Sequence, residues 1–341
     1  MDQPTDRTHL RLTWVRQQLQ QPLLELVPAS SDASFRSYWR GQRADGRSVV
    51  VMDAPPGRED VRPWLEVQRR LENAGLHVPE VYASHVKQGF VVMEDLGNRT
   101  YLPALDENHV EDLYDEAMVA LLTMQQHCSY DGLPAYNGNR LIEEMELMPR
   151  WFLQRHLGFE PACEDWDILE QAFRHLVQSA LTQPQVFVHR DFHSRNLLIT
   201  EQRSPGIIDF QDALQGPLTY DLVSLLKDCY VSWPRDRVSI WLEHYHHRLR
   251  KVGLLDRAGD FSSFLQAFER MGMQRHLKVL GIFCRLAYRD GKTGYLADLP
   301  RVFDYVLEAA RHDSAFRDLA TLLQRAVDHR DLSTRRACAV Q

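Results

Sequence analysis

The chain has 341 residues, 44% of them hydrophobic, which is enough to bury the cores of two lobes. Its formal net charge of −7 excludes a general nucleic-acid binder, because such proteins neutralise phosphates with clustered Lys and Arg. The five cysteines form no CxxC pair, so we expect reduced thiols and no zinc site. No segment is apolar enough for a signal peptide or a membrane span, which predicts a cytoplasmic protein without membrane contacts, and we expect a monomer.

The first part of the chain combines helical patterns with short strands. Apolar residues recur at three- and four-residue steps through residues 10–26, which predicts an amphipathic helix. A second helix is predicted over residues 60–74, ended by Gly75. Strands are expected at residues 30–40, 46–57, 78–84 and 89–94. A polar turn at residues 43–46 joins the first two strands into a hairpin, so the segment predicts a small antiparallel sheet with one main helix.

The remainder of the chain is predicted to be mostly helical. Residues 110–127 have helical spacing, and the apolar runs at 185–189 and 206–209 each end in a charged cluster. We place the domain boundary near Asp95. The expected architecture is therefore α+β, with a nucleotide-binding lobe at residues 1–95 and a helical catalytic and substrate lobe at residues 96–341.

The two charged clusters have the spacing of a kinase catalytic loop and its metal-binding aspartate. Residues 186–199, VFVHRDFHSRNLLI, place Asp191 five positions before Asn196, and GIIDFQD places Asp209 after the next apolar run. Phosphoryl transfer needs a carboxylate that accepts the substrate hydroxyl proton, a role that fits Asp191. It also needs oxygen ligands for Mg²⁺ on the nucleotide phosphates, which fits Asn196 and Asp209. His189 is interpreted as a support of the loop.

Each fragment alone also has an ordinary structural interpretation. HRD could be a salt-bridged turn, and Asp209 could cap a helix. The full pattern, with an apolar strand before each cluster, favours the catalytic interpretation.

The same segments resemble a known superfamily. The blocks HRDFHSRNLLI (189–199) and GIIDFQDALQGPLTYDLVSLLKDCY (206–230) are similar to aminoglycoside phosphotransferases and choline kinases. DASFRSYWR (32–40), VVVMDAPP (49–56) and QRHLKVLGIFCRLAYRDGK (274–292) resemble bacterial anomeric amino-sugar kinases. The resemblance implies a bilobal protein-kinase-like fold that binds ATP and Mg²⁺ in its cleft. It also implies phosphorylation of the C1 hydroxyl of N-acetylmuramate and N-acetylglucosamine, giving α-1-phosphates in the recycling of cell-wall sugars.

The nucleotide side departs from the protein-kinase pattern. Residues 91–97, VVMEDLG, follow a strand as a kinase hinge does, so we expect the C=O of Glu94 and the N–H of Leu96 to pair with adenine. A glycine-rich loop and a strand lysine are both missing. The positive field on the phosphates is therefore assigned to backbone N–H groups at Ser34 and Phe35, or to Arg36 or Arg40. Alternatively, Arg36 is a solvated strand residue.

The acceptor site is assigned to polar residues near the catalytic loop and to a basic helix. The candidates beside the loop and the second metal residue are His193, Arg195, Gln211 and Asp212. Residues 269–292 read as a helix in which Arg275 and Lys278 share a face that could receive the lactyl carboxylate of N-acetylmuramate. The alternative for all of these residues is plain solvation, the helix being an exposed charged one. The resemblance implies that Asp221 braces the catalytic loop.

Two other classes of function remain open from the sequence, a kinase of another small molecule and a pseudokinase. A kinase of an aminoglycoside would need a strongly acidic site, and a choline kinase would need an aromatic cage. A nucleotide-binding pseudokinase would agree with the missing lysine. The complete set of Asp191, Asn196 and Asp209 favours catalysis instead.

Overall fold

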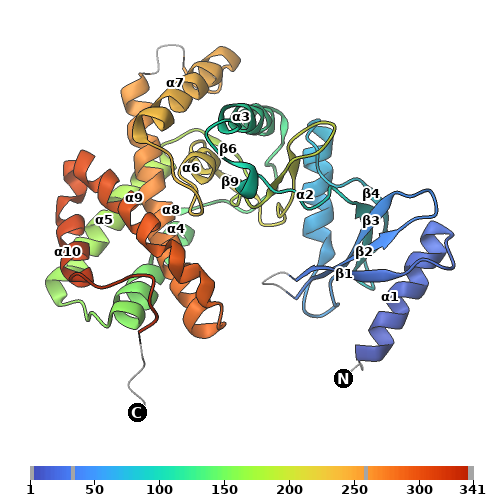
Figure 1. Ribbon diagram of the computed structural model, residues 1–341. Helices are drawn as coiled ribbons and strands as arrows, with labels where there is room; N and C mark the ends of the chain where they lie inside the picture. Colours follow the sequence, from blue (N-terminus) through green and yellow to red (C-terminus); the bar gives the residue numbers. More distant parts are fainter. Residues whose placement is uncertain (1–3, 32–34, 257–259, 337–341) are drawn as a thin grey trace. The chain divides into compact units, whose positions relative to one another are not determined.

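The computed structural model describes residues 4–31, 35–256 and 260–336, and it divides into two compact units (Figure 1). Unit 1 comprises Met1–Met124 and Arg195–Asp212, and unit 2 comprises Gln125–Ser194 and Ala213–Gln341. Each unit is thus built from two separate stretches of chain, a division that differs from a single boundary near Asp95. The helix α3 (Val110–His127) carries the chain from unit 1 into unit 2, and its bounds are those that the sequence predicts.

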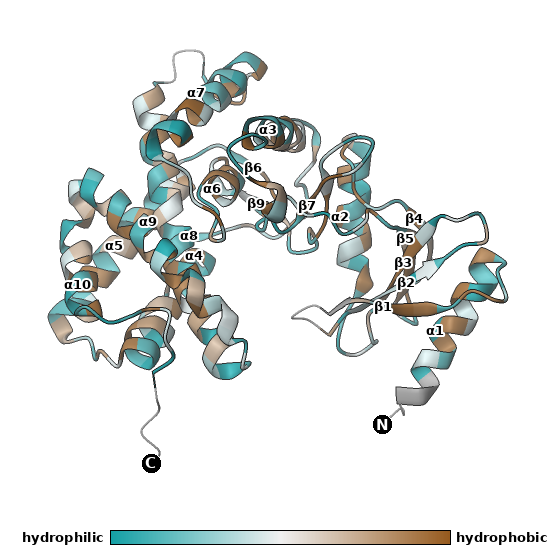
Figure 2. Ribbon diagram, viewed as in Figure 1, coloured by the Kyte–Doolittle hydropathy of each residue, from teal (hydrophilic) through white to brown (hydrophobic). Residues whose placement is uncertain are grey.

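Unit 1 is organised around a five-stranded antiparallel sheet with the strand order β1-β2-β3-β5-β4. The strands are β1 (Leu26–Ser31), β2 (Ser37–Gln42), β3 (Ser48–Asp53), β4 (Val81–His85) and β5 (Phe90–Glu94). The central strands β3 and β5 are among the most hydrophobic parts of the unit (Figure 2). The sheet and the β2–β3 hairpin are confirmed, whereas the strand predicted at residues 30–40 is replaced by two strands.

The helix α1 (Pro4–Leu19) covers one face of the sheet. Trp14 and Val15 pack in one apolar cluster with residues of β3 and β5. The helix predicted to reach residue 26 ends seven residues earlier, and this part of the prediction is wrong. Pro22 explains the difference, because proline lacks the N–H that a continuing helix would use.

The helix α2 (Val61–Asn73) starts at a capping residue, as expected. The side chain of Asp60 accepts a hydrogen bond from the N–H of Arg62 at 3.0 Å. The helix stops before Gly75, which has a φ of +83°. On its buried side the ring of Trp64 lies 5.1 Å from that of Phe210. Phe210 follows the small hairpin of β7 (Leu197–Leu198) and β8 (Gly206–Ile207), so this contact ties the second stretch of unit 1 to the first.

Unit 2 is mostly helical. Its helices are α4 (Gly138–Met145), the π-helical segment Met148–Leu157, α5 (Cys163–Leu181), α6 (Tyr220–Leu226), α7 (Arg235–Val252), α8 (Phe261–Arg289), α9 (Leu299–His312) and α10 (Arg317–Val327). β6 (Gln185–Val188) pairs with β9 (Leu214–Pro217) in an antiparallel ribbon. No helix within the described residues is long and apolar enough to cross a membrane.

The helix α8 runs through the core of unit 2. Residues along its length, among them Leu277, Leu280 and Cys284, are buried in one apolar cluster with α5, α9 and α10. Arg275 and Lys278 are only 4% and 7% exposed, so the alternative of an exposed charged helix is wrong at these positions.

Candidate active site

The catalytic loop begins where β6 ends, and a buried carboxylate holds its first residues. The backbone N–H groups of His189 and Arg190 donate hydrogen bonds to Asp221 at 2.7 and 3.0 Å. The N–H of Asp191 donates to Nδ1 of His189 at 3.2 Å. Arg190 has a φ of +80°, a conformation that costs free energy in a residue other than glycine and that these bonds help to maintain. Asp221 thus fixes the direction in which Asp191 leaves the strand.

A second buried aspartate holds the other end of the loop. Asp228 accepts hydrogen bonds from the N–H and the hydroxyl of Ser194, at 3.0 and 2.5 Å. The sequence analysis missed this residue. Asp228 lies two residues beyond the end of α6 (Tyr220–Leu226), so the helix that carries Asp221 near its start leads to Asp228 just after its end.

Asp191 lies in the wall of a cavity of about 140 Å³ within unit 2. The lining residues are Asp191, His193, Tyr220, Cys229, Tyr230, Arg275, Lys278, Val279, Ile282, Phe283, Leu286 and Tyr295. The surrounding protein would raise the pKa of Asp191 by desolvation, but the positive charges of His193, Lys278 and Arg275 outweigh this effect and lower it. The carboxylate is therefore ionised at neutral pH.

Glu144 on α4 organises two of the cations around this cavity. It accepts hydrogen bonds from Nη2 of Arg190 and from the hydroxyl of Tyr136. Its Oε2 lies 3.2 Å from Nζ of Lys278, which also donates to the hydroxyl of Tyr220 at 3.1 Å. Burial would raise the pKa of Glu144, but Lys278 and Arg190 lower it. Sequence reasoning did not find Glu144, because its segment reads as a charged helix surface.

The structure brings together only part of the predicted acceptor set. His193, Arg275 and Lys278 line the cavity that contains Asp191. Arg195, Gln211 and Asp212 belong to unit 1 and do not line it. Gln211 instead donates from Nε2 to Oδ1 of Asp209 at 2.8 Å.

Unit 1 contains a separate cavity of about 470 Å³, within the usual range for small-molecule sites. The lining residues are Ala29, Tyr38, Arg40, Val50, Trp64, Pro79, Met93, Glu94, Asp95, Leu96, Gly97, Asn98, Thr100, Asn196, Leu198, Ile208, Asp209 and Phe210. The predicted hinge residues Glu94 and Leu96 thus share one cavity with Asn196 and Asp209. Nδ2 of Asn196 lies 3.3 Å from Oδ2 of Asp209, so an amide and a carboxylate group are adjacent there.

Arg40 is the sole cation among the residues that line this cavity, and it forms an ion pair with Asp95 in the predicted hinge segment. Its Nε and Nη2 donate to the carboxylate of Asp95 at 2.6 and 2.9 Å. Asp95, with a side chain 5% exposed, is desolvated, which raises its pKa, but the hydrogen bonds from Arg40 and Ser48 lower it. Arg40 therefore stabilises the segment after Glu94.

Two of the other candidates for phosphate binding, Phe35 and Arg36, do not line this cavity. The backbone N–H of Phe35 donates to Oε1 of Glu59 at 3.2 Å, and the Phe35 ring is 59% exposed. Arg36 does not line the cavity, and Ser34 lies outside the described residues. A phosphate could accept from the N–H of Phe35 only in place of Glu59, and the assignment of this amide stays a prediction.

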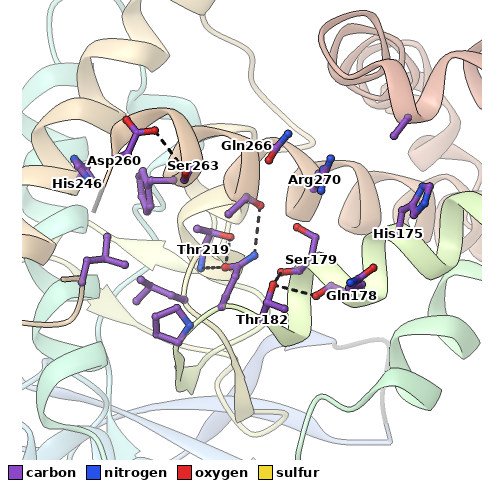
Figure 3. A pocket seen from close by; sticks show the side chains of 17 residues that line it. His175, Gln178, Ser179, Thr182, Thr219, His246, Asp260, Ser263, Gln266 and Arg270 are labelled. Atoms are coloured by element: carbon purple, nitrogen blue, oxygen red, sulfur yellow. Dashed lines mark hydrogen bonds between the residues drawn. The ribbon is translucent and has the colours of Figure 1, made fainter. Parts of the chain in front are cut away.

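A larger cavity of unit 2, about 610 Å³, does not include Asp191 (Figure 3). Thr219, which is among its lining residues, donates from its N–H and its hydroxyl to Oε1 of Gln183 at 3.1 and 2.8 Å. Gln183 precedes β6 and Thr219 precedes α6. This pair therefore ties together the starts of the two elements that hold the catalytic loop.

Comparison with known proteins agrees with this geometry. Residues 25–261 match the model of the phosphotransferase enzyme family. The N-acetylmuramate/N-acetylglucosamine kinase of Pseudomonas aeruginosa is 46% identical over 302 residues, which are 89% of this chain and 88% of that protein. The enzyme of the same name from Neisseria meningitidis is 40% identical over 314 residues, which are 91% of this chain and 93% of that protein.

Solved structures show the fold. A Plasmodium vivax ethanolamine kinase has a TM-score of 0.62 at 11% identity and covers 91% of this chain and 89% of its own. An ADP-bound aminoglycoside phosphotransferase has a TM-score of 0.55 at 18% identity and covers 87% of this chain and 97% of its own. The chain therefore has the predicted bilobal, protein-kinase-like fold and belongs to the phosphotransferase enzyme family.

Proposed function

We propose that this kinase transfers the γ-phosphoryl group of ATP to the anomeric C1 hydroxyl of N-acetylmuramate and N-acetylglucosamine, giving their α-1-phosphates in the recycling of cell-wall sugars. The observation that carries the proposal is the position of Asp191, an ionised carboxylate that shares a cavity with two buried cations. The names of relatives at 40–46% identity support the choice of acceptor.

Nucleotide binding is assigned to unit 1. The C=O of Glu94 and the N–H of Leu96 would pair with adenine, and Arg40 would hold this segment through Asp95. Asn196 and Asp209 fit Mg²⁺, because their amide and carboxylate groups are adjacent and both groups carry oxygen atoms of the kind that this ion prefers. When bound, Mg²⁺ would neutralise charge on the nucleotide phosphates.

Acceptor binding and proton transfer are assigned to unit 2. As the acceptor oxygen forms its bond to the γ-phosphorus and the bond to ADP breaks, the hydroxyl proton moves to the carboxylate of Asp191. A carboxylate with a lowered pKa is a weak base. It suits the anomeric hydroxyl, which is more acidic than the other sugar hydroxyls because its carbon also carries the ring oxygen. This argument supports phosphorylation at C1.

A coupled ADP-release assay tests the substrate class. Mg-ATP is offered with N-acetylmuramate, N-acetylglucosamine, kanamycin or choline, and the product is analysed by phosphorus NMR. Turnover with the two sugars and a phosphorus signal coupled to the anomeric proton are expected. Methyl glycosides of the same sugars, in which the C1 oxygen is blocked, should not react. Turnover with kanamycin or choline alone would reject the sugar assignment, and no turnover with any acceptor would favour a pseudokinase.

Two variants test the assigned roles. Asp191→Asn is expected to lower kcat by about 10²- to 10⁴-fold with little change in ATP affinity, because general-base catalysis contributes on that order. Asp209→Asn is expected to remove the difference in ATP affinity that calorimetry detects between Mg²⁺ and EDTA in the wild type. Loss of ATP affinity alone in the first variant, or an unchanged Mg²⁺ effect in the second, would contradict these roles.

A further inference from the structure

Arg275 is a buried cation that forms no direct ion pair with a carboxylate of the described residues, and Asp191 and Asp228 act on its charge only from a longer distance. Its guanidinium has one hydrogen bond, from Nη1 to Sγ of Cys229 at 3.2 Å. Burial raises the pKa of the Cys229 thiol to about 11, so this sulfur is neutral at physiological pH and does not serve as the counterion. A buried charge without a direct ion pair is costly, and such groups usually have one, so this guanidinium indicates a carboxylate that is not part of the chain.

The neighbouring cation in the same cavity differs from Arg275 in this respect. Nζ of Lys278 lies 3.2 Å from Oε2 of Glu144 and 3.1 Å from the hydroxyl of Tyr220. Glu144 also accepts a hydrogen bond from Arg190. The charge of Lys278 is thus already balanced within the protein. Of the two predicted acceptor cations, Arg275 is therefore the one whose charge is left for a ligand.

The rest of the cavity limits what that ligand can be. Beside Arg275 and Asp191, its wall includes the aliphatic side chains Val279, Ile282 and Leu286. Its volume of about 140 Å³ is below the range of about 300–1,000 Å³ that takes up whole small molecules. It fits one part of an acceptor, namely an anionic group on a short aliphatic branch, next to the hydroxyl that reacts.

We propose that Arg275 binds the carboxylate of an acidic sugar acceptor, in a bidentate ion pair, and so determines the preference for N-acetylmuramate over neutral amino sugars. This inference rests on the proposed function. The lactyl ether of N-acetylmuramate supplies a carboxylate and a methyl group on one short branch, which matches the charge and the aliphatic wall of the cavity. N-acetylglucosamine has no such group and would leave Arg275 unpaired.

The anion that binds Arg275 could instead be the transferred phosphoryl group. Kinetic measurements distinguish this group from the carboxylate of the acceptor. The kinetic constants of the wild type and of Arg275→Met are measured with N-acetylmuramate, with its primary carboxamide and with N-acetylglucosamine. If Arg275 binds the carboxylate, the variant loses about 10- to 100-fold in kcat/KM for the acid, chiefly through KM, because hydrogen bonds to charged groups are worth that much. The amide and N-acetylglucosamine should change by less than about threefold, since neither carries the anion.

The kinetic constants of the wild type alone already test the ion pair between Arg275 and the carboxylate. It should prefer the acid to the carboxamide, and Arg275→Met should treat the two alike. Arg275→Lys, which keeps the charge but not the planar fork, should recover part of the preference. An equal loss for all three acceptors would assign Arg275 to the phosphoryl group and overturn the proposal. No preference of the wild type for the acid would overturn it as well.

The controls separate this proposal from misfolding and from the proposed function. Arg289→Met removes a cation from the same helix, where Arg289 is 56% exposed and pairs with Asp290, and it should leave all constants unchanged. Lys278→Met should lower turnover of all three acceptors together, and a loss confined to the acid would transfer the role to Lys278. If the wild type phosphorylates neither sugar, the proposed function fails. Calorimetric binding of the acid against the carboxamide then still decides whether Arg275 holds a carboxylate.

Discussion

The carboxylate of Asp228 accepts hydrogen bonds from both the N–H and the hydroxyl of Ser194, at 3.0 and 2.5 Å, and so closes the end of the catalytic loop that Asp221 does not reach. Asp228→Ala is expected to leave two buried donors unsatisfied and to lower the free energy of unfolding by about 1–3 kcal/mol. A shift of the loop should lower kcat by about tenfold or more, while the KM for ATP stays within about threefold. Urea unfolding and steady-state kinetics measure both effects.

The conservative variant separates positioning from packing. Asp228→Asn keeps an acceptor oxygen for Ser194 and should recover most of kcat. If Asp228→Ala lowered stability but left kcat intact, Asp228 would be a structural residue only.

The ion pair of Arg40 with Asp95 gives a prediction for the hinge. Arg40→Met keeps most of the aliphatic stem but leaves the carboxylate of Asp95, beside the proposed adenine position, without its bidentate partner. The KM for ATP is expected to rise about 3- to 10-fold with kcat nearly unchanged, because the variant disturbs ground-state binding. A double-mutant cycle with Asp95→Asn should show that the two effects are not additive. Additive effects would show that the pair does not act as a unit.

For Gly281 on α8 we expect a change in stability opposite to the one that helix propensity predicts. Replacing a helical glycine by alanine ordinarily stabilises a helix by about 0.5–1 kcal/mol. A Cβ at position 281 would lie 2.4 Å from the carbonyl carbon of Leu147, so Gly281→Ala should instead destabilise the protein by about 1–3 kcal/mol. Gly272 is the matched control on the same helix, since its added Cβ would meet nothing closer than 3.7 Å. Gly272→Ala should be neutral or stabilising in thermal unfolding.

Two buried histidines predict how stability depends on pH. Burial lowers the pKa of His276 well below 6.5, helped by the charge of Arg275, and burial also lowers the pKa of His156. Below about pH 6.5 the unfolded chain binds protons at these sites and the folded chain does not, so their contribution to stability is complete above that pH and is lost as the pH falls. The contribution of these two histidines to the free energy of unfolding should therefore decrease between pH 7 and pH 5, whereas Asp221, whose pKa burial raises to about 7, contributes in the opposite direction.

The variant His276→Gln keeps an N–H donor for the carbonyl of Lys227 but does not titrate. It should make the decline shallower by up to about 1.4 kcal/mol per pH unit, the effect of one proton. His127→Gln, at an exposed position, should leave the slope as in the wild type. Equal slopes in His276→Gln and the wild type would show that His276 does not contribute.

The elements that the sequence predicts well are those that local chemistry determines. The helix over residues 60–74 starts at a capping aspartate and stops at a glycine that takes a positive φ, and both signals are visible in the sequence. The helical spacing of apolar residues that starts at residue 10 continues through Leu23 and Leu26, beyond Pro22. A helix predicted from this spacing alone therefore overlaps the start of the first strand. The boundary was therefore predictable from the proline, but the strand that follows depends on its pairing with β2.

The candidate site shows a similar division. The spacing of Asp191, Asn196 and Asp209 is local and can be read directly. Glu144 could not be found in that way, because its role depends on Arg190 and Lys278, which lie 46 residues or more away in the chain. The burial of Arg275 has the same origin, since a helix surrounded by other helices can bury its charged residues as well as its apolar ones.

The hairpin segment Arg195–Asp212 belongs to unit 1 although unit 2 precedes and follows it in the chain. A fragment that ends at Met124 would lack Asn196, Leu198, Ile208, Asp209 and Phe210, which line the cavity of unit 1 proposed to bind the nucleotide. No single cut therefore releases a complete nucleotide-binding unit. Recombination between relatives could not exchange the acceptor unit as one terminal block, because two separate stretches would have to be replaced around the retained hairpin. New acceptor specificities are thus expected to arise by single substitutions at positions such as 275.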